Sequence, residues 1–282
     1  MTNKILIPKA ALFHDISAFG RCALSVIIPV IAALEVQPIA IPTALLSTHT
    51  GGFKDFSFLD LTDEMKKIIA HHEKLDIKFD AVYSGFLGSN KQIEIISEFI
   101  KKQKEKNAFI FIDPVMADSG KLYSSYSDEM RRNMINLIRY ADVITPNITE
   151  TFFLLDMPFQ APPYTKDFVN NLLFRLMDLH FGIKTVIITS VELENGEYGV
   201  AYGERDGKVK YKFTNKHNVD YPGSGDMFSS IVCGYILNGY SFDQAVSYAV
   251  EYIDVVIKYT MKCGTPVREG LAFEKFLRDL KI

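Results

Sequence analysis

The stretch Tyr221-Pro222-Gly223-Ser224-Gly225-Asp226-Met227-Phe228 is the most informative part of the sequence. Its glycines, Gly223 and Gly225, allow a tight turn and a close approach of the backbone to a ligand. The apolar residues that follow predict a helix near Asp226–Leu237, whose free N–H groups and dipole attract an anion. Asp226 repels phosphate, but it can accept a proton from a hydroxyl that attacks phosphorus. The pattern therefore favours a phosphoryl-transfer site over a simple phosphate cradle.

A plainer interpretation of this stretch is an ordinary helix N-terminus, with Gly-Ser-Gly as a turn and Asp226 complementing the helix dipole. Two other nucleotide-binding motifs fail. A dinucleotide fingerprint needs a small residue where Phe228 stands, and it should follow the first strand of the chain. No G-x-x-x-x-G-K-[ST] sequence occurs, so this is not a P-loop protein. The missing fingerprint also argues against a nicotinamide-dependent oxidoreductase.

Outside this stretch, short apolar runs alternate with longer segments of helical period, the pattern of βαβ units around a parallel sheet. The expected strands are residues 10–13, 38–42, 81–84, 108–112, 143–145, 185–189, 198–202 and 208–213. The expected helices are residues 22–33, 60–72, 91–106, 127–139, 166–179, 226–237, 242–258 and 271–280. The runs 198–202 and 208–213 flank a turn and predict an antiparallel hairpin. We therefore expect an α/β fold with a mostly parallel central sheet, helices on both faces and a β-hairpin near the C-terminal third.

Composition limits the classes of protein to consider. With 282 residues and 48% apolar composition, residues 1–282 are expected to form a single domain. A net charge of -3 and the lack of a basic stripe argue against a nucleic-acid partner. No apolar stretch approaches 18 residues, so no membrane span is expected. Cys22, Cys233 and Cys263 are widely spaced and fit a reducing compartment, which predicts a cytoplasmic location.

Polar residues follow several of the expected strands. Open α/β sheets bind ligands at the carboxyl ends of their strands, so these residues are candidates for a site. They are His14-Asp15, Thr43 to Gly52, Gly85-Phe86, Asp113-Pro114, Pro146-Asn147 and Ser190.

Five motifs, taken together, resemble the ribokinase-like superfamily and, within it, the pyridoxal/pyridoxamine kinase branch. They are Ser47-Thr48-His49-Thr50-Gly51, Ser84-Gly85-Phe86-Leu87-Gly88-Ser89, Asp113-Pro114-Val115-Met116, Pro146-Asn147-Ile148-Thr149-Glu150 and Gly223-Ser224-Gly225-Asp226. They occur in the family's order. The resemblance implies a ribokinase-like fold and ATP-dependent phosphorylation of the 5'-hydroxymethyl group of a B6 vitamer, which is pyridoxal, pyridoxamine or pyridoxine.

The resemblance also implies roles for the residues of the second half of the chain. Asp226 would be the general base, and the N–H groups of the Gly223-Ser224-Gly225 turn would hold the transferred phosphoryl group. Asp113, Asn147 and Ser190 are expected to contact ATP. Glu150 and Asp113 are expected near Mg²⁺, an ion that keeps several waters and needs few carboxylates. The plainer alternatives are that Glu150 lies in the first turn of a helix opened by Pro146, and that Asp113 caps the next segment.

On the substrate side, the resemblance implies contacts from the following residues: His14, Asp15, Thr43, Ser47, His49 and Phe86. Phe86 stands where the family usually has tyrosine, so the stacking face is kept and the hydroxyl is lost. His14-Asp15 stands where relatives have Ser-His, which leaves the contact to the ring nitrogen open. His49 could donate to the phenolic oxygen of a B6 ring, a contact that would favour B6 vitamers.

Two alternative functions remain open at this point. A hydroxymethylpyrimidine or phosphomethylpyrimidine kinase of thiamine synthesis also acts on a CH₂OH group carried by an aromatic ring. A nucleotide- or B6-binding regulator would keep the fold without the chemistry, but intact Asp226 argues against it. The expected partners are Mg²⁺ with ATP and a small heterocyclic alcohol. The preferred vitamer, the need for a monovalent cation such as K⁺ and the oligomeric state stay open, with a homodimer suggested by the relatives.

Overall fold

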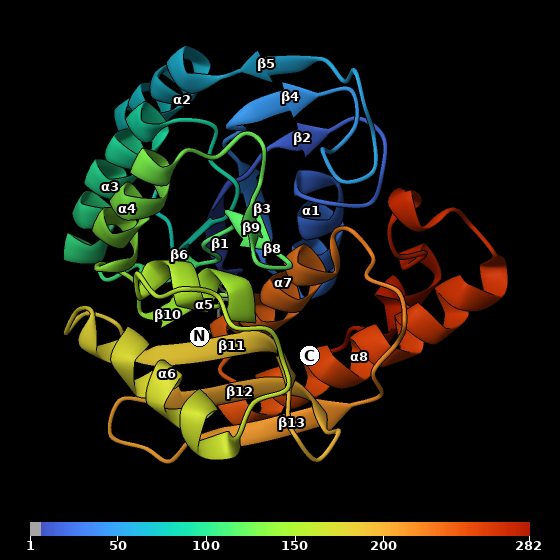
Figure 1. Cartoon of the computed structure of the whole chain (residues 1–282). Coiled ribbons are helices and arrows are strands. Elements are labelled where there is room, and N and C mark those ends of the chain that lie inside the picture. The colour runs from blue at the N-terminus through green and yellow to red at the C-terminus, as the bar shows by residue number, and fades with distance from the viewer. Residues whose placement is uncertain (1–6) are drawn as a thin grey trace, which may run out of the picture.

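The structure is a computed structural model that describes residues 7–282. Its centre is an eight-stranded sheet in the order β13-β12-β11-β10-β7-β6-β1-β3 (Figure 1). The parallel part comprises β1 (Lys9–Phe13), β3 (Gln37–Ala40), β6 (Ala81–Ser84), β7 (Phe109–Ile112), β10 (Val143–Ile144) and β11 (Thr185–Glu192). Two antiparallel strands, β12 (Tyr198–Glu204) and β13 (Lys210–Thr214), complete one edge.

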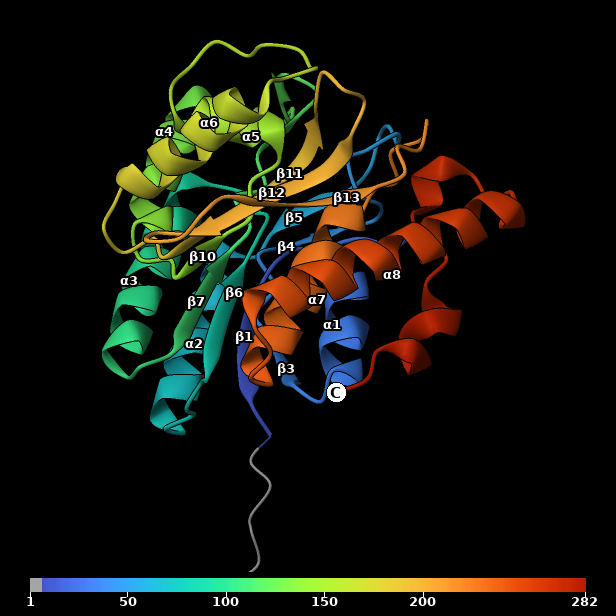
Figure 2. The same cartoon turned by 90° about the horizontal axis from the view of Figure 1, so that it is seen from below.

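Helices cover both faces of this sheet (Figure 2). One face packs against α1 (Leu24–Ala33), α7 (Ser224–Leu237) and α8 (Phe242–Cys263). The other packs against α2 (Thr62–Lys74), α3 (Asn90–Glu105), α4 (Asp128–Ile138), α5 (Ile148–Leu154) and α6 (Lys166–Asp178). Successive side chains of a strand point to opposite faces, so in β1 Leu12 enters the first core and Phe13 the second. The predicted fold, including the hairpin, is confirmed.

The last predicted helix, Leu271–Leu280, is wrong. Instead of an α-helix the chain forms two short 3₁₀ turns, Val267–Glu269 and Glu274–Asp279. Gly270, at φ 78°, lies between them. Leu271 and Phe273 are buried in the core of α1, α7 and α8, and the Ala272 N–H donates to Thr260 Oγ1 at 2.9 Å. Tertiary anchors of this kind override the local helical period.

A second, three-stranded sheet was not predicted. It consists of β2 (Ile16–Ser17), β4 (Ala44–Leu46) and β5 (Phe58–Asp60), and a short hairpin of β8 (Ala117–Asp118) and β9 (Lys121–Leu122) follows β7. Strands of two or three residues are too short to show a period of two. Both small sheets follow strand ends of the central sheet, so they add loops and edges around the carboxyl ends of its strands.

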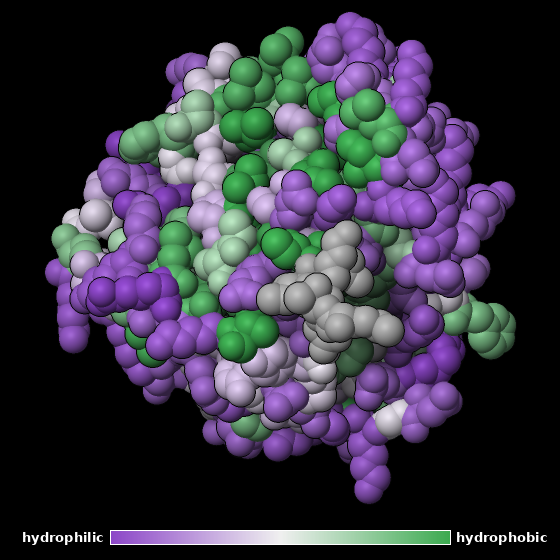
Figure 3. Space-filling view, turned by 180° about the vertical axis from the view of Figure 1, so that it is seen from behind, coloured by the Kyte–Doolittle hydropathy of each residue, from purple (hydrophilic) through white to green (hydrophobic). Residues whose placement is uncertain are grey.

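Seen from behind, hydrophilic residues cover most of the molecule and hydrophobic ones are interspersed among them (Figure 3). Among residues 7–282, no helix has the length and apolar character needed to cross a bilayer. The central sheet takes strands from Lys9 to Thr214, which agrees with the single domain expected for residues 1–282, although that boundary stays a prediction.

Candidate active site

The glycine-rich turn opens α7, two residues earlier than predicted. Gly223 adopts the left-handed conformation, with φ 81°, and a Cβ there would lie 2.0 Å from the Arg21 carbonyl oxygen. Only glycine fits that position. Gly225, by contrast, is exposed, and a Cβ there would meet nothing within 4 Å. The first N–H groups of a helix have no partner inside it, so the N-terminus of α7 offers free donors beside open space.

Asp226 lies in the first turn of α7 and is held from the other end of the chain. Its Oδ2 accepts a hydrogen bond of 2.7 Å from the Ala23 N–H, which precedes α1. Ala23 reaches this place with a positive φ of 49°. Burial raises the pKa of Asp226, and the Ala23 N–H lowers it in part. A carboxyl group with a raised pKa that remains hydrogen-bonded suits a general base working near neutral pH.

Asp113 extends from the end of β7 toward the same helix. Ser229, one turn after Asp226, donates to Asp113 Oδ2 at 2.9 Å, and the Ser229 and Thr145 hydroxyl oxygens lie 3.0 Å apart. Burial and then the charge of Asp226 raise the pKa of Asp113 to about 8, while the Ser229 hydrogen bond opposes the shift. Asp113 and Asp226, both candidate site residues of the sequence analysis, are therefore close enough to interact electrostatically.

Asp15 is the third carboxyl group at this place. Only 7% of the residue is exposed, and Ser17 Oγ donates to its Oδ2 at 3.0 Å. Burial, followed by the charge of Asp226, raises the pKa of Asp15 to about 7. The ion pairs formed within residues 7–282 include none with Asp15, Asp113 or Asp226. The three acids thus share a region without a basic side chain to neutralise them.

Asn147 and Glu150 form a capping box at the start of α5. Asn147 Oδ1 accepts from the Glu150 N–H at 2.9 Å, and Glu150 Oε2 accepts from the Asn147 N–H at 2.8 Å. This arrangement matches the plainer alternative, in which Glu150 lies in the first turn of a helix. Glu150 Oε1 also accepts from Met116 N–H at 3.0 Å, and Asn147 Nδ2 donates to Ala117 O at 2.8 Å. The pair therefore also fixes the segment that follows Asp113.

Glu150 belongs to the same acidic region. It is 3% exposed, and burial followed by the charge of Asp113 raises its pKa well above the usual range. Burial, followed by the charges of Glu150 and Asp118, raises the pKa of the hydroxyl of Tyr123, a residue that the sequence prediction did not include. No group of three or more His, Cys, Asp or Glu side chains within the described residues could hold a metal by itself. The metal role of Glu150 and Asp113 stays a prediction.

Ser190 lies on the strand next to Asn147. Thr189 and Asn147 form an isolated parallel bridge, and Thr189 N–H donates to Pro146 O at 3.0 Å. Ser190 itself is exposed and has φ 59°, at a bulge in the pairing of β11 with β12. Such a bulge turns a side chain away from its regular direction at a strand end. Its predicted contact with ATP is not tested by this geometry.

Thr43 and Phe86, both expected on the substrate side, lie together. Thr43 is fully buried, and its Oγ1 donates to the Phe86 carbonyl oxygen at 3.0 Å. The Thr43 hydroxyl proton is thus committed, and only its lone pairs remain for a ligand. Phe86 is half-buried, with its ring 6.4 Å from the ring of Tyr126. The Phe86 ring therefore packs on one side against Tyr126.

Ser47 and His49 hold their own loop. Ser47 Oγ accepts from Ser57 N–H at 2.9 Å, which closes the connection between β4 and β5. His49 Nε2 contacts the Arg268 carbonyl oxygen at 2.6 Å, and its Nδ1 accepts from Gly51 N–H at 3.1 Å. Both ring nitrogens are engaged, so the expected hydrogen bond from His49 to a substrate oxygen has no donor in this structure. Burial lowers the pKa of His49, which keeps the ring neutral.

His14 is fully buried, and its predicted contact with the substrate stays a prediction. Its ring is fully buried against Gly85, where an added Cβ would come within 2.3 Å of the imidazole. The Tyr83 ring lies edge-on with the two centroids 4.4 Å apart, and burial lowers the His14 pKa to about 3. Neither ring nitrogen has a partner among the described residues. The geometry favours a packing role for His14 over a direct substrate contact.

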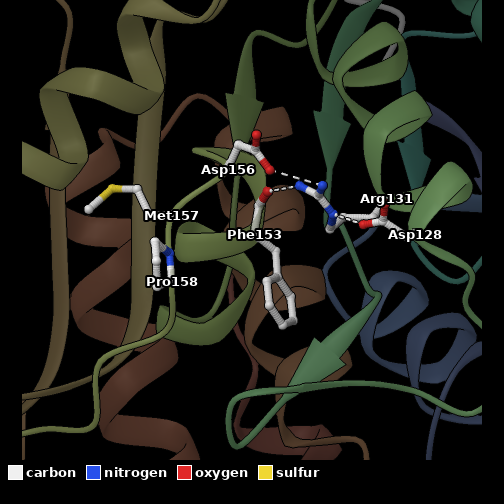
Figure 4. A pocket seen from close by; sticks show the side chains of 6 residues that line it. All are labelled: Asp128, Arg131, Phe153, Asp156, Met157 and Pro158. Carbon is white, nitrogen blue, oxygen red and sulfur yellow. Dashed lines mark hydrogen bonds and ion pairs between the residues drawn. The ribbon is translucent and has the colours of Figure 1, made fainter.

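A cavity of about 340 Å³ lies elsewhere, between α4 and the end of α5 (Figure 4). Arg131 occupies its wall with donors already engaged by Asp128 at 2.7 Å, the Phe153 carbonyl at 2.8 Å and Asp156 at 3.0 Å. The remaining lining residues are Met157 and Pro158. No predicted site residue lines this cavity, and its one cation is satisfied within the protein.

Three relationships within the candidate site were absent from the sequence prediction: Ala23 with Asp226, Ser229 with Asp113, and Tyr123 near the acids. Ser229 carried a usable signal, because it stands three residues after Asp226 and therefore on the same helix face. The Ala23 contact carried none, since it depends on a backbone N–H and a positive φ.

Comparison with known proteins places these features in a family. A family model described as phosphomethylpyrimidine kinase matches residues 28–269. A phosphomethylpyrimidine kinase homologue from Bacteroides thetaiotaomicron, crystallised with pyridoxal, is 40% identical with a TM-score of 0.92, covering 98% of this chain and 96% of its own. A pyridoxal kinase from Lactobacillus plantarum is 27% identical with a TM-score of 0.88, covering 98% and 97%.

Curated proteins of lower sequence identity also include pyridoxal kinases. Pyridoxal kinase PdxY of Pasteurella multocida is 25% identical over 240 residues, or 81% of each chain. A pyridoxal kinase homologue of Schizosaccharomyces pombe is 27% identical over 205 residues, and the match spans 57% of its length. The resemblance drawn from the five motifs is confirmed by these matches.

Proposed function

The chain belongs to the phosphomethylpyrimidine kinase family, whose model matches residues 28–269, and from this membership we propose that it is an ATP-dependent kinase of B6 vitamers. It transfers the γ-phosphoryl group of ATP to the 5'-hydroxymethyl group of pyridoxal, pyridoxamine or pyridoxine. The named pyridoxal kinases among its relatives support this enzyme class. ATP as donor, the reacting hydroxyl and the base are parts of the proposal.

One observation carries the chemistry. Asp226 stands in the first turn of α7 beside the exposed Gly225, with open space where a Cβ would lie, and it is fixed by the Ala23 N–H. A base and free helix N–H donors thus face the same opening. A protein that only bound nucleotide would have no need of a carboxylate there, because a phosphate is repelled by it.

The residues of the acidic region fit a divalent cation. Burial and then the charge of Asp226 raise the pKa of Asp113, and burial and then the charge of Asp113 raise that of Glu150. No basic side chain among residues 7–282 forms an ion pair with either carboxyl group. A cation with its waters would relieve that repulsion. We expect Asp113 and Glu150 to hold Mg²⁺ together with the phosphates of ATP, since this ion takes few protein carboxylates. When bound, the ion supplies charge neutralisation to the phosphates.

The protein's own groups then act in order. Asp226 accepts the proton of the substrate hydroxyl as that oxygen attacks the γ-phosphorus and the bond to ADP breaks. The N–H groups of Gly225 and Asp226 stabilise the transferred phosphoryl oxygens, whereas the Ser224 N–H donates to the Tyr221 carbonyl oxygen at 3.2 Å. Thr43 and Phe86 hold the substrate ring, with Phe86 stacking and Thr43 accepting a hydrogen bond from a ring donor.

Hydroxymethylpyrimidine is the second candidate substrate, because the matching family model carries the name of a phosphomethylpyrimidine kinase. The pyridoxal in the crystals of the Bacteroides homologue favours the B6 reading instead. An assay of ADP release with pyridoxal, pyridoxamine, pyridoxine and hydroxymethylpyrimidine decides between them. A higher kcat/KM for any B6 vitamer supports the proposal; preference for the pyrimidine contradicts it.

A further inference from the structure

Gln92 is a buried polar side chain to which the sequence gave no role. It lies in the first turn of α3 and is 0% exposed. Buried carboxamides are nearly always hydrogen-bonded, and what they bind usually explains why they are there. The partners of Gln92 come from segments that are far apart in the sequence and meet at the substrate side of the site.

The carboxamide makes hydrogen bonds with both of its ends. Its Oε1 accepts from the Gly88 N–H at 2.8 Å, and its Nε2 donates to the Thr43 carbonyl at 2.9 Å and to Thr62 Oγ1 at 3.0 Å. An Asp60 carboxylate oxygen lies 3.4 Å from the same nitrogen. Gly88 N–H can only donate and the Thr43 carbonyl can only accept, so the orientation of the amide is fixed by its partners.

These contacts form a closed circuit around the ring-binding residues. Thr43 Oγ1 donates to the Phe86 carbonyl at 3.0 Å, and Gly88 follows Phe86 in the same turn. Gln92 therefore ties the loop after β3 to the loop after β6, the two segments that carry Thr43 and Phe86. Gly88 is closely packed, since an added Cβ would lie 3.3 Å from the Phe58 ring. The circuit leaves little freedom for one loop to move without the other.

We infer that Gln92 is a positioning residue that sets the spacing of Thr43 and Phe86 and so determines the affinity for the substrate ring. The inference rests on the proposed function of that site. It predicts that disturbing Gln92 raises the KM for the B6 vitamer while leaving the KM for ATP unchanged, because the expected nucleotide residues lie beyond β6, on β7, β10, β11 and α7. A purely structural role would lower the amount of folded enzyme, and so the apparent kcat, while leaving both KM values unchanged.

The test is Gln92→Glu, a nearly isosteric change. A carboxylate still accepts from Gly88 N–H, but it cannot donate to the Thr43 carbonyl or to Thr62, and it places a charge beside Asp60. We expect the KM for pyridoxal to rise about tenfold at pH 8, with the KM for ATP within about twofold of wild type. Below about pH 6 a protonated glutamic acid regains one donor, so the ratio of variant to wild-type KM should fall.

Gln103→Glu is the matched control. Gln103 lies on the same helix, is 2% exposed and is remote from Thr43 in the network, so it tests the general cost of a buried carboxylate on α3. Gln92→Met, which is neutral, serves if Gln92→Glu does not fold; it should raise the same KM at every pH. Equal KM values for pyridoxal in wild type and both Gln92 variants, or an equal rise for Gln103→Glu, would overturn the inference.

Failure of the proposed function looks different. In that case wild-type enzyme would phosphorylate no B6 vitamer, whereas failure of the inference leaves an active enzyme with an unchanged KM. If hydroxymethylpyrimidine proves to be the substrate, the same three variants are compared with it. An unaltered KM for the pyrimidine in Gln92→Glu would then overturn the role of Gln92.

Discussion

The carboxylate of Asp226 accepts a hydrogen bond of 2.7 Å from the backbone N–H of Ala23, although 203 positions separate the two residues in the chain. The segment around Ala23 also packs on the glycine turn, since Gly223 has room for no Cβ against the Arg21 carbonyl. The N-terminal segment thus orients the proposed base, while α7 supplies it. A substitution at Asp226 must be chosen with this contact in mind.

Replacing Asp226 with Asn should lower kcat about a hundredfold or more, because the amide cannot take up the substrate proton. The Asn oxygen can still accept from Ala23 N–H, so the fold and the KM for ATP should change little. Steady-state kinetics and a melting curve provide the measurement. Near-wild-type kcat in this variant would place the base elsewhere.

Replacing Gly225 with Ala should separate stability from activity. The added methyl group meets nothing within 4 Å, and alanine favours a helix by roughly 0.5–1 kcal/mol over glycine, so the melting temperature should stay or rise. The same methyl group occupies the space expected for the phosphoryl group, so kcat/KM should fall about tenfold or more. Gly234→Ala is the control on the same helix: its Cβ would lie 2.5 Å from Leu34, and it should destabilise the fold. Full activity in Gly225→Ala would argue against phosphoryl binding at this turn.

Replacing Glu150 with Gln should raise the Mg²⁺ concentration needed for half-maximal rate several-fold, because an anionic partner near the ion is lost. The KM for the B6 vitamer should be unaffected. Gln244→Ala at the start of α8 removes part of another capping box and controls for the helix start alone. A magnesium titration that matches wild type would leave Glu150 with its capping role only.

The raised pKa values predict how stability depends on pH. Burial and the charge of Asp226 raise the pKa of Asp15 to about 7 and that of Asp113 to about 8. In this interval the folded state holds protons that the unfolded state has released, so stability should fall as pH rises from about 4 to 8. Asp113→Asn removes one such group, so its melting temperature relative to wild type should be higher at pH 8 than at pH 5.

The control for this pH effect is Asp128→Asn. Asp128 is an exposed acid whose pKa is lowered, chiefly by the hydrogen bond from Arg131. Its removal should not reproduce the gain at pH 8. A difference between Asp113→Asn and wild type that is the same at both pH values would mean that Asp113 is not held protonated in the folded protein.

The His49 and Phe86 variants test what selects the substrate ring. Because both nitrogens of His49 bind the backbone, His49→Ala should loosen the loop and raise the KM for pyridoxal and hydroxymethylpyrimidine alike, leaving their ratio unchanged. Phe86→Ala removes the stacking face and should depress kcat/KM for both rings. The measurement is kcat/KM on the two substrates. If the ratio of kcat/KM for pyridoxal to kcat/KM for hydroxymethylpyrimidine falls only in His49→Ala, then His49 does contact the B6 ring when substrate is bound.

The sequence was sufficient to predict the strands of the central sheet and the motifs that follow them. The runs that became β1, β6 and β7 are apolar on both faces, as buried parallel strands must be, so their period and length were legible. Polar residues at their ends marked one edge, and Asp113 was expected there, while Asp226 was expected at the start of a helix. The three-stranded sheet escaped, because β2, β4 and β5 are too short to carry a pattern.

Local sequence does not reveal the hydrogen-bond partners of a side chain. His49 was expected to donate to the substrate, and in this structure its ring nitrogens contact the Arg268 carbonyl and the Gly51 N–H, so that expectation stays a prediction. Gln92 drew no prediction from the sequence, yet in the structure it joins Thr43 to Gly88. Hydrogen-bond partners of this kind are set by distances between loops, which no pattern along the chain encodes.

The sequence by itself determined the fold, the family and the position of the proposed base, because periodicity, glycine placement and motif order are properties of the chain read in one direction. Only the tertiary structure decided how Asp226 is held, why the pKa values of Asp15 and Asp113 are raised, and which residues Gln92 contacts. The physical reason is that burial and contact between distant segments create these effects: desolvation and hydrogen bonding act through space, and they exist only once the chain has closed on itself.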